Sequence, residues 1–330
     1  MERILVVGAG AIGRHLAAAL AGAGIDTTLL GRGAAVQAIA AHGLRIEGDG
    51  AAPPRTVRLN AIEYRPGPGG YDAVFVCVKS HQLAGIAPAL AATIGRDAAL
   101  VFPQNGLPWW YFDGCAEPLR GARIRCLDPD GDLARYVDPA RIVGAVIYKS
   151  VQAIGPDAIR TVDLPEDRLV LGEPDGTRSA RVAQLAALVE RTGLPVVQTA
   201  DIRREKWRKL VTNVAWNPVC ALTRSTIAEV SRDPETRRLC GALMAEALRV
   251  ARRVGASPDV DPDAVLEAGA RKTGHVPSML QDLRAGRTLE HAAIVGALLE
   301  VGALVGETLP TLAAIGALIA QLDASTSSPR

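Results

Sequence analysis

The chain has 330 residues, of which 48% are hydrophobic and 22% charged, and its formal net charge is +2. This length and composition are typical of a globular protein with about two domains. Charges of both signs are mixed along the chain and only 4% of the residues are aromatic. This argues against a surface that follows phosphates or stacks on bases, so we expect no nucleic-acid partner.

Neither end of the chain has the pattern of a targeting or membrane segment. The chain opens with MERILVVGAGAIG, whose glycines and brevity favour a buried first strand over a signal peptide. The most apolar stretch near the C-terminus is interrupted by Glu300, Glu307 and Pro310, which leaves no run of roughly 18 apolar residues. We therefore expect a cytoplasmic protein with no membrane partner.

Cysteine and histidine residues are few and dispersed. The five cysteines form no CxxC pair; they are Cys77, Cys115, Cys126, Cys220 and Cys240. The sequence therefore predicts no metal site. We expect these cysteines to be small buried side chains that stay reduced.

Strand-like and helix-like runs alternate from the start of the chain. RILVVG is followed by a helical stretch from Ala11 to about Ala23, then by DTTLLG and a second helical stretch through Ala41, which is a βαβ pattern. Further on, YDAVFVCVK and AALVFPQ are nearly continuous apolar runs, typical of strands covered on both faces of a parallel sheet. These runs predict a doubly wound sheet.

The pattern changes after Arg141. Short strand candidates (RIVGAVIY, AIRTVDL, RLVLGE) alternate with Gly, Pro and Asp and predict a more antiparallel extension of the sheet. A helix over about 177–192 and the strand LPVVQT close this part. From Asp201 to about Leu322 only helical periodicity remains. We predict an α/β domain over 1–199 and an all-α domain over 200–330.

A glycine-rich loop follows the first predicted strand directly. Gly8, Gly10 and Gly13 form GAGAIG, and Ala11 and Ile12 open the helix that comes next. In a dinucleotide-binding loop the first glycine permits the tight turn, the second lets the backbone approach a pyrophosphate, and the third lets helix and strand pack. The NH groups at the helix start favour the phosphates. A glycine-rich turn without a ligand is the alternative.

The end of the second predicted strand indicates which nucleotide this loop binds. Sites selective for NAD usually carry Asp or Glu there, but this strand ends with Gly31 and Arg32. A guanidinium suits a ribose 2′-phosphate, which a carboxylate would repel. The sequence therefore predicts NADPH as the cofactor. The alternative is that Arg32 is an ordinary solvated charge.

A polar face interrupts the apolar segment KWRKLVTNVAWNPV. Lys209, Asn213 and Asn217 follow one another at steps of four and share one face of a helix. A carbonyl that accepts a hydride becomes an alkoxide and needs a proton, which a lysine of lowered pKa can supply. The asparagines can hold substrate oxygens without adding charge. The alternatives are a solvated helix face, or a helix that ends or kinks at Asn217-Pro218.

Two segments resemble the ketopantoate reductase family. KWRKLVTNVAWNPVCAL is similar to its signature helix, where the matching Lys209 is the general acid and Asn213 and Asn217 contact substrate. PSMLQDLRAGRTLE is similar to a second family segment, in which Ser278 contacts substrate and Glu290 is the functional glutamate. Glu290 could hold Lys209 protonated or accept a hydrogen bond from a substrate hydroxyl, and both roles stay open. We expect Asp282 to fix the segment through Arg284 or Arg287.

Two shorter fragments fit the same resemblance. VKS places Lys79, and QNG places Asn105, at the ends of successive predicted strands, where a doubly wound sheet collects its ligand contacts. In the family these positions face the cofactor and the substrate, and a second ammonium at Lys79 would help to lower the pKa of Lys209.

The resemblance implies a fold, a reaction and a partner. The implied fold is a Rossmann-type domain followed by a helical domain similar to the C-terminal domain of 6-phosphogluconate dehydrogenase. The implied reaction is the NADPH-dependent reduction of a 2-keto acid, with ketopantoate (2-dehydropantoate) to pantoate, a step of pantothenate biosynthesis, as the leading pair. Alternatives are a reductase of another 2-keto acid and a non-catalytic NADP(H)-binding redox sensor. The chain could be a monomer or a homodimer.

The segment between Gly106 and Val143 departs from the family pattern, because it is longer than the matching stretch of the pantothenate-pathway enzymes. Its residues 109–112 read WWYF and follow closely after Asn105. They could form a wall or lid over a substrate cleft, or an aromatic plug that packs the loop onto a core.

Overall fold

The computed structural model describes residues 1–50, 53–63, 69–95 and 97–327. The chain divides into two compact units. The first, here called the α/β unit, comprises residues 1–104, 113–115 and 131–202. The second, here called the helical unit, comprises residues 105–112, 116–130 and 203–330. Two segments between 105 and 130, within the expected first domain, therefore belong with the helices.

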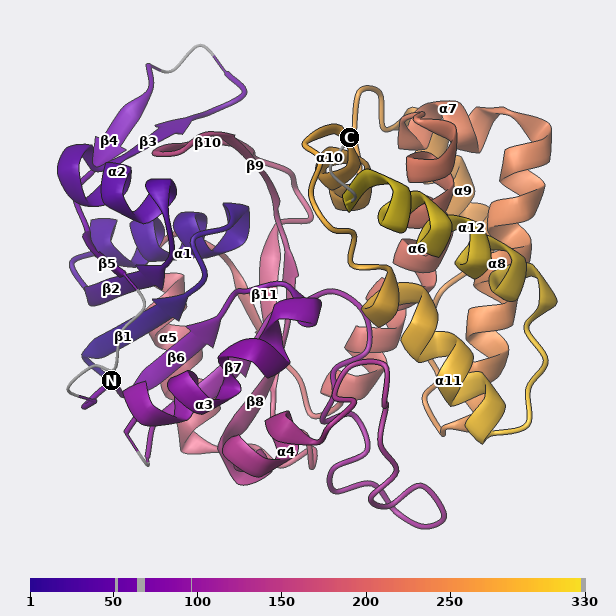
Figure 1. Ribbon diagram of the computed structural model, residues 1–330, viewed down its shortest axis with the longest axis horizontal. Helices are drawn as coiled ribbons and strands as arrows, with labels where there is room; N and C mark the ends of the chain where they lie inside the picture. Colours follow the sequence, from indigo (N-terminus) through magenta and orange to yellow (C-terminus); the bar gives the residue numbers. More distant parts are fainter. Residues whose placement is uncertain (51–52, 64–68, 96, 328–330) are drawn as a thin grey trace. The chain divides into compact units, whose positions relative to one another are not determined.

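An eight-stranded sheet forms the centre of the α/β unit, in the order β12-β11-β8-β7-β6-β1-β2-β5 (Figure 1). Neighbouring strands are parallel except β8 and β11. The doubly wound sheet with a partly antiparallel extension is thereby confirmed. The strands are β1 (Arg3–Val7), β2 (Asp26–Gly31), β5 (Asn60–Glu63), β6 (Ala73–Val76), β7 (Ala99–Phe102), β8 (Ile142–Tyr148), β11 (Arg168–Gly172) and β12 (Val196–Gln198).

A second sheet of four strands, in the order β4-β3-β10-β9, was only partly predicted. The apolar run of β10 indicated a strand, but β3, β4 and β9 mix exposed and buried residues and gave no clear pattern. The strands of this sheet are β3 (Leu44–Glu47), β4 (Arg55–Val57), β9 (Ser150–Gly155) and β10 (Ala158–Val162).

Helices α1 and α5 pack into one core with the strands. Leu16 and Leu20 of α1 and Leu185 of α5 join alternate strand residues, Ile4 and Val6 among them, as the two-residue period of a strand requires. The helices of this unit are α1 (Ala11–Gly22), α2 (Ala34–His42), α3 (Leu83–Thr93), α4 (Asp132–Tyr136) and α5 (Ala180–Glu190), with 3-10 turns at Ser80–Gln82 and Pro139–Arg141.

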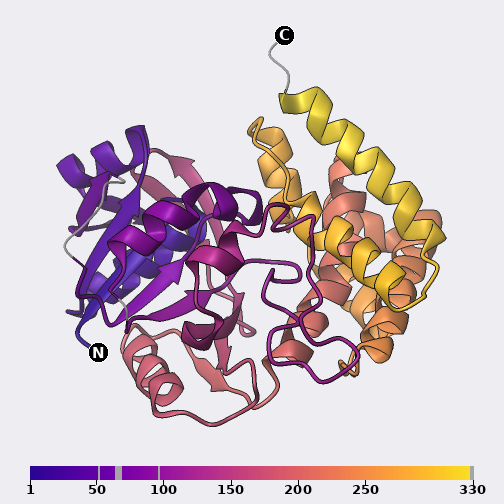
Figure 2. The ribbon, with the colours of Figure 1, turned by 60° about the horizontal axis from the view of Figure 1, so that its bottom comes forward.

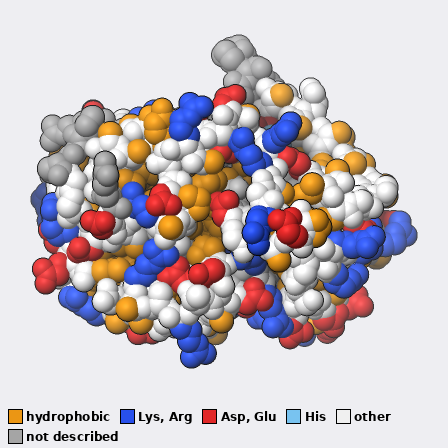
Figure 3. Space-filling view, turned by 90° about the horizontal axis from the view of Figure 1, so that it is seen from below, with side chains coloured by type: hydrophobic (Ala, Val, Ile, Leu, Met, Phe, Trp, Pro, Cys, Tyr) orange, Lys and Arg blue, Asp and Glu red, His pale blue; other side chains and the backbone are white. Residues whose placement is uncertain are grey.

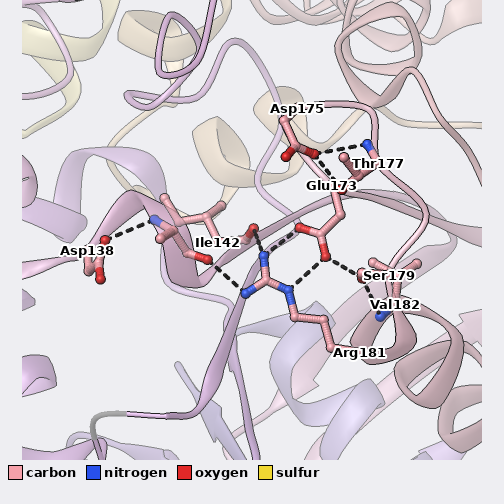
Figure 4. Close-up of polar contacts among 9 residues, drawn as sticks. Asp138, Ile142, Glu173, Asp175, Thr177, Ser179, Arg181 and Val182 are labelled. Carbon is pink, nitrogen blue, oxygen red and sulfur yellow. Dashed lines mark hydrogen bonds and ion pairs between the residues drawn. The ribbon is translucent and has the colours of Figure 1, made fainter.

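A buried ion pair joins the start of α5 to the sheet (Figure 4). The Glu173 carboxylate, 4% exposed, accepts from Arg181 Nε at 2.7 Å and from the Ser179 hydroxyl. Arg181 also donates to the Ala140 carbonyl at 2.8 Å. Ser179 caps α5 by accepting from the Val182 amide at 3.2 Å. These contacts join the start of α5 to the residue that follows β11 and to the turn that precedes β8.

The helical unit contains no strand among its described residues, as expected. Figure 2 shows α12 as a long helix that leads toward the C-terminus. No helix in the described part of the chain is long and apolar enough to span a membrane. The helices are α6 (Ile202–Thr223), α7 (Ile227–Arg232), α8 (Pro234–Arg253), α9 (Pro262–Arg271), α10 (Ser278–Arg284), a π-helix (Ala292–Gly296), α11 (Ala297–Leu304) and α12 (Pro310–Ser327).

Basic and acidic side chains are interspersed on the face of the molecule that Figure 3 presents. No large area of one sign covers that face, in keeping with the net charge of +2.

Candidate active site

The glycines of the GAGAIG loop meet strict steric demands. Gly8 has φ +111°, and a Cβ built on it would lie 2.7 Å from the Val78 amide nitrogen. A Cβ on Gly13 would lie 1.9 Å from the Gly8 carbonyl oxygen. Any larger side chain at Gly8 or Gly13 would push the loop, the strand or helix α1 out of place. Gly10 differs, because a Cβ there would meet nothing within 4 Å.

Arg14, which was not among the predicted site residues, fixes this loop from the end of the first turn of α1. Its Nε donates to the Ala9 carbonyl at 2.6 Å, and its Nη1 donates to the carbonyls of Gly155 and Pro156 at 2.7 and 3.0 Å. Arg14 is 7% exposed, so these bonds form away from solvent, where they are strongest. The loop is thereby tied to the turn between β9 and β10.

The end of β2 has no room for an acidic side chain. Gly31 is buried, and a Cβ on it would lie 2.7 Å from Val36 Cγ2 and 2.9 Å from the Ala9 Cβ. The carboxylate that NAD-selective sites place here is therefore excluded by packing. Arg32, the next residue, is exposed.

Gln104 joins the loops that follow β6 and β7. Its Nε2 donates to the carbonyls of Val76 and Val78, at 2.6 and 3.0 Å. The Val78 carbonyl directly precedes Lys79, which is half-buried. Gln104 therefore fixes the backbone beside Lys79 and the peptide that leads into Asn105. No sequence pattern indicates this role.

The polar face of α6 forms as predicted, and the helix continues beyond Pro218 to Thr223. The alternative that it ends at Asn217-Pro218 is therefore wrong. Asn217 is 4% exposed, and its Oδ1 accepts from the Ser278 hydroxyl at 3.3 Å and from the Met279 amide at 3.2 Å. Two predicted site residues, 61 positions apart, thus meet at the start of α10.

Asn213 carries an unsatisfied donor. Its Nδ2 is buried and has no hydrogen-bond partner among the described residues. A buried polar group without a partner costs about 1–3 kcal/mol, and such groups are rare in folded proteins outside sites that bind a ligand or water. Asn213 Nδ2 is therefore an unused donor on the helix face that carries Lys209.

Lys206 is a second lysine on α6, one helical turn before Lys209, and the sequence analysis did not select it. Its side chain is 3% exposed. Burial, and to a smaller extent the charge of Lys209, lower its pKa from 10.5 to about 7. The i, i+3 spacing in KWRK is the signal that could have found it.

The segment around Glu290 is held by several contacts within the helical unit. Asp282, 6% exposed, accepts from Arg287 Nε at 3.0 Å, which confirms Arg287 as one of the two expected partners. Gly106 has φ +82°, and a Cβ on it would lie 2.2 Å from the Ala293 carbonyl oxygen. That oxygen accepts from the Leu107 amide at 3.1 Å. The loop after Asn105 therefore packs on the π-helix that follows Glu290.

The WWYF segment is an aromatic plug. Trp110, Tyr111 and Phe112 are each 1% exposed, and the Tyr111 hydroxyl accepts from Trp207 Nε1 at 2.7 Å. The Tyr111 carbonyl accepts from Arg203 Nε at 2.9 Å. These side chains pack the segment onto α6, so the interpretation as a lid or wall is not supported.

The predicted residues are divided between the units. The α/β unit carries Gly8, Gly10, Ala11, Ile12, Gly13, Arg32 and Lys79, and the helical unit carries Asn105, Lys209, Asn213, Asn217, Ser278 and Glu290.

A cavity of about 650 Å³ in the helical unit includes none of these predicted residues. It is lined by Phe112, residues 121–123, Arg125, Pro129, Glu300, Val301 and Leu304.

The cysteines only partly follow their prediction. Cys220 and Cys240 are buried, and burial raises the pKa of each thiol to about 12. Cys126 is exposed, so the expectation of burial is wrong there. No group of three or more metal-ligating side chains occurs within the described part of the chain.

Two family models match this chain. The ketopantoate reductase model (PanE/ApbA) matches residues 4–176, and the model of the C-terminal domain of the same family matches residues 201–323. The chain belongs to the ketopantoate reductase family. The sequence-based assignment to this family of oxidoreductases is confirmed.

Relatives in this family match over nearly the whole chain. A 2-dehydropantoate 2-reductase from Mesorhizobium japonicum is 39% identical over 97% of both chains, and one from Archaeoglobus fulgidus is 28% identical over 92% of this chain and 91% of its own. A crystal structure of 2-dehydropantoate 2-reductase from Geobacter metallireducens has a TM-score of 0.82 at 27% identity and covers 97% of this chain and 99% of its own.

A D-mandelate dehydrogenase solved with NADH and anilino(oxo)acetate has a TM-score of 0.83 at 19% identity and covers 99% of this chain and 100% of its own. At that identity the similarity concerns the fold alone. The fold is therefore common to proteins named for different acids.

Proposed function

We propose that this protein reduces ketopantoate to pantoate with NADPH, as a cytoplasmic enzyme of pantothenate biosynthesis. The observation that carries the proposal is the face of α6. It combines Lys209, the unsatisfied Asn213 amide and the Asn217–Ser278 pair, in a chain 39% identical to a 2-dehydropantoate 2-reductase. We also propose that the α/β unit binds the cofactor and that the helical unit binds the substrate.

The residues of the α/β unit fit a dinucleotide. Gly8 and Gly13 admit no side chain, and Gly10 leaves open space where a pyrophosphate could approach. The amides of Ala11 and Ile12 begin α1, whose N-terminus favours phosphate. The packed Gly31 excludes a carboxylate and Arg32 is exposed beside it, which favours a 2′-phosphate and hence NADPH.

The reaction needs a proton as well as a hydride. NADPH, when bound, supplies the hydride to the carbonyl carbon of the 2-keto acid. Lys209 Nζ then gives its proton to the carbonyl oxygen, and solvent restores that proton. Asn213 Nδ2 donates a hydrogen bond to a substrate oxygen, and the Ser278 hydroxyl and Asn105 hold the remaining polar groups of the acid.

Charge around Lys209 assists this proton transfer. Lys206, one turn away, is buried, and its pKa is lowered to about 7 by burial and by Lys209. The two amines disfavour being protonated at the same time, so the pair holds its second proton weakly. We assign Lys79, in the α/β unit, to the cofactor. Glu290 orients Lys209 or accepts from a substrate hydroxyl.

The test follows the absorbance of NADPH after the protein is mixed with ketopantoate, and a loss of absorbance reports oxidation of NADPH. A panel of other 2-keto acids, an NADH arm and a control without substrate accompany it. Ketopantoate should be among the best substrates by kcat/KM, and NADPH should be preferred to NADH. If another 2-keto acid is clearly better, the pathway assignment falls and the reaction class stays. Binding of NADPH without turnover of any 2-keto acid favours a redox sensor.

The oligomeric state stays a prediction of monomer or homodimer. A ketopantoate reductase from Staphylococcus aureus, 22% identical, is described as dimeric. Sedimentation of this protein, with and without NADPH, decides the question.

A further inference from the structure

The chain around Glu290 leaves regular helix geometry. Glu290 is half-buried, follows the buried Leu289 and precedes a π-helix at Ala292–Gly296. A π-helix is rare, and it occurs most often as a single turn at functional sites. Glu290 lies directly before this irregular turn, so contacts that hold its neighbours Leu289 and His291 bear on the position of its side chain.

One carboxylate holds the residues on both sides of Glu290. Asp323, on α12, is 8% exposed. Its Oδ1 accepts from the Leu289 amide at 2.9 Å, and its Oδ2 lies 3.4 Å from His291 Nε2. Each oxygen of one side chain therefore contacts a direct neighbour of Glu290. Hydrogen bonds to a buried carboxylate are among the stronger ones in proteins.

Helix α12, which carries Asp323, is held in place by a cap at its start and by buried side chains along its length. At its first turn the Glu246 carboxylate, on α8 and 4% exposed, accepts from the amides of Thr311 and Leu312 at 3.0 and 2.9 Å. Leu312 and Ile319 are fully buried along the helix. Asp323 therefore projects from a helix that is fixed by a cap at its start and by packing along its length.

We propose that Asp323 is the positioning residue for Glu290, so that α12 sets the direction of the functional carboxylate. This inference rests on the proposed function, in which Glu290 acts on Lys209 or on the substrate. Asp323 touches neither the substrate nor the cofactor in this account. It acts through the Leu289 amide and His291 alone.

The test is a double-mutant cycle of Asp323→Asn and Glu290→Gln, measured with ketopantoate or with the best 2-keto acid of the panel. Asp323→Asn keeps the size of the side chain and removes its charge. We expect kcat to fall about 10- to 100-fold, because small misplacement of a catalytic group costs that much. The Kd for NADPH should stay unchanged. In the Glu290→Gln background the same substitution should have no further effect on kcat.

Glu246→Gln is the matched control, because it removes the charge of another buried carboxylate at the opposite end of α12 but keeps one oxygen that can accept from the helix amides. It should lower the melting temperature and leave kcat near the parent value. Wild-type kcat in Asp323→Asn, or an equal fall of kcat in the Glu290→Gln background, overturns the inference alone. A parent enzyme that turns over no 2-keto acid overturns the proposed function, and the inference falls with it.

Discussion

The glycine loop of the α/β unit and the polar face of the helical unit encode function in different ways. In the loop, Gly8 and Gly13 have no room for a side chain. A short glycine motif in the sequence reveals this constraint. On α6, the constraint is contact with distant residues, as in the 61-residue separation of Asn217 and Ser278. The glycine constraint can be read from the loop itself, whereas the contact of Asn217 with Ser278 appears only in the folded chain.

Lys209→Ala should have the largest effect, and it should change turnover without changing cofactor binding. Loss of a general acid lowers kcat by about 10²- to 10⁴-fold. The glycine loop is in the other unit, so the Kd for NADPH, followed by fluorescence, should stay near the wild-type value. Unchanged turnover would remove Lys209 from the mechanism, and lost NADPH binding would show that the two regions are not independent.

A second change, Lys206→Met, tests whether the buried amine of Lys206, beside the polar face of α6, lowers the stability of the folded protein. The pKa of Lys206 is about 7 in the folded protein and 10.5 as the ordinary value. Between these values the unfolded chain binds more protons than the folded one, so the contribution of this group to stability rises with pH. The buried charge of Lys206 therefore destabilises the folded protein fully below pH 7 and not at all above about pH 10.5.

The stability of Lys206→Met relative to the parent should therefore be highest at low pH, where the parent carries the buried charge, and should change by on the order of a few kcal/mol across the titration. The gain should shrink as the pH rises toward 10. Urea unfolding of both proteins at pH 6, 8 and 10 measures it. A stability difference that is the same at all three values would contradict the buried, weakly basic Lys206.

The glycine loop is tested by the pair Gly13→Ala and Gly10→Ala. The first places a Cβ 1.9 Å from the Gly8 carbonyl oxygen, and the second places one in open space. Overpacking of this kind costs about 1–3 kcal/mol or more, so Gly13→Ala should lower both the melting temperature and NADPH affinity. Gly10→Ala should weaken NADPH binding at an unchanged melting temperature. Equal stability loss in both would refute the steric distinction.

The smallest expected effects distinguish the two asparagines. Asn217→Ala leaves the Met279 amide without its acceptor and should destabilise the protein by about 1–3 kcal/mol. Asn213→Ala removes a buried donor that has no partner among the described residues, so stability should be unchanged or higher while KM for the 2-keto acid rises. A destabilised Asn213→Ala variant would argue for a structural role of that amide.

The fold class, the order of the large elements and the family were predictable, because apolar periodicity and three motifs lie along continuous stretches of chain. The small sheet was missed in part because β3, β4 and β9 are short and partly exposed. Gln104, Arg14 and Asp323 were missed because each acts through a backbone amide or carbonyl far away in sequence. Side chains that bind backbone leave no pairing pattern in a single sequence.

The division of the chain also limits how the gene can be recombined. Residues 105–112 and 116–130 fold with the helices, and Tyr111 is bound to Trp207, although Ala200 lies between them in sequence. A chimera with a relative, joined near Ala200, would pair the plug of one parent with the α6 of another. Crossover sites at the edges of both segments, 105–112 and 116–130, keep the plug and its helix from the same parent.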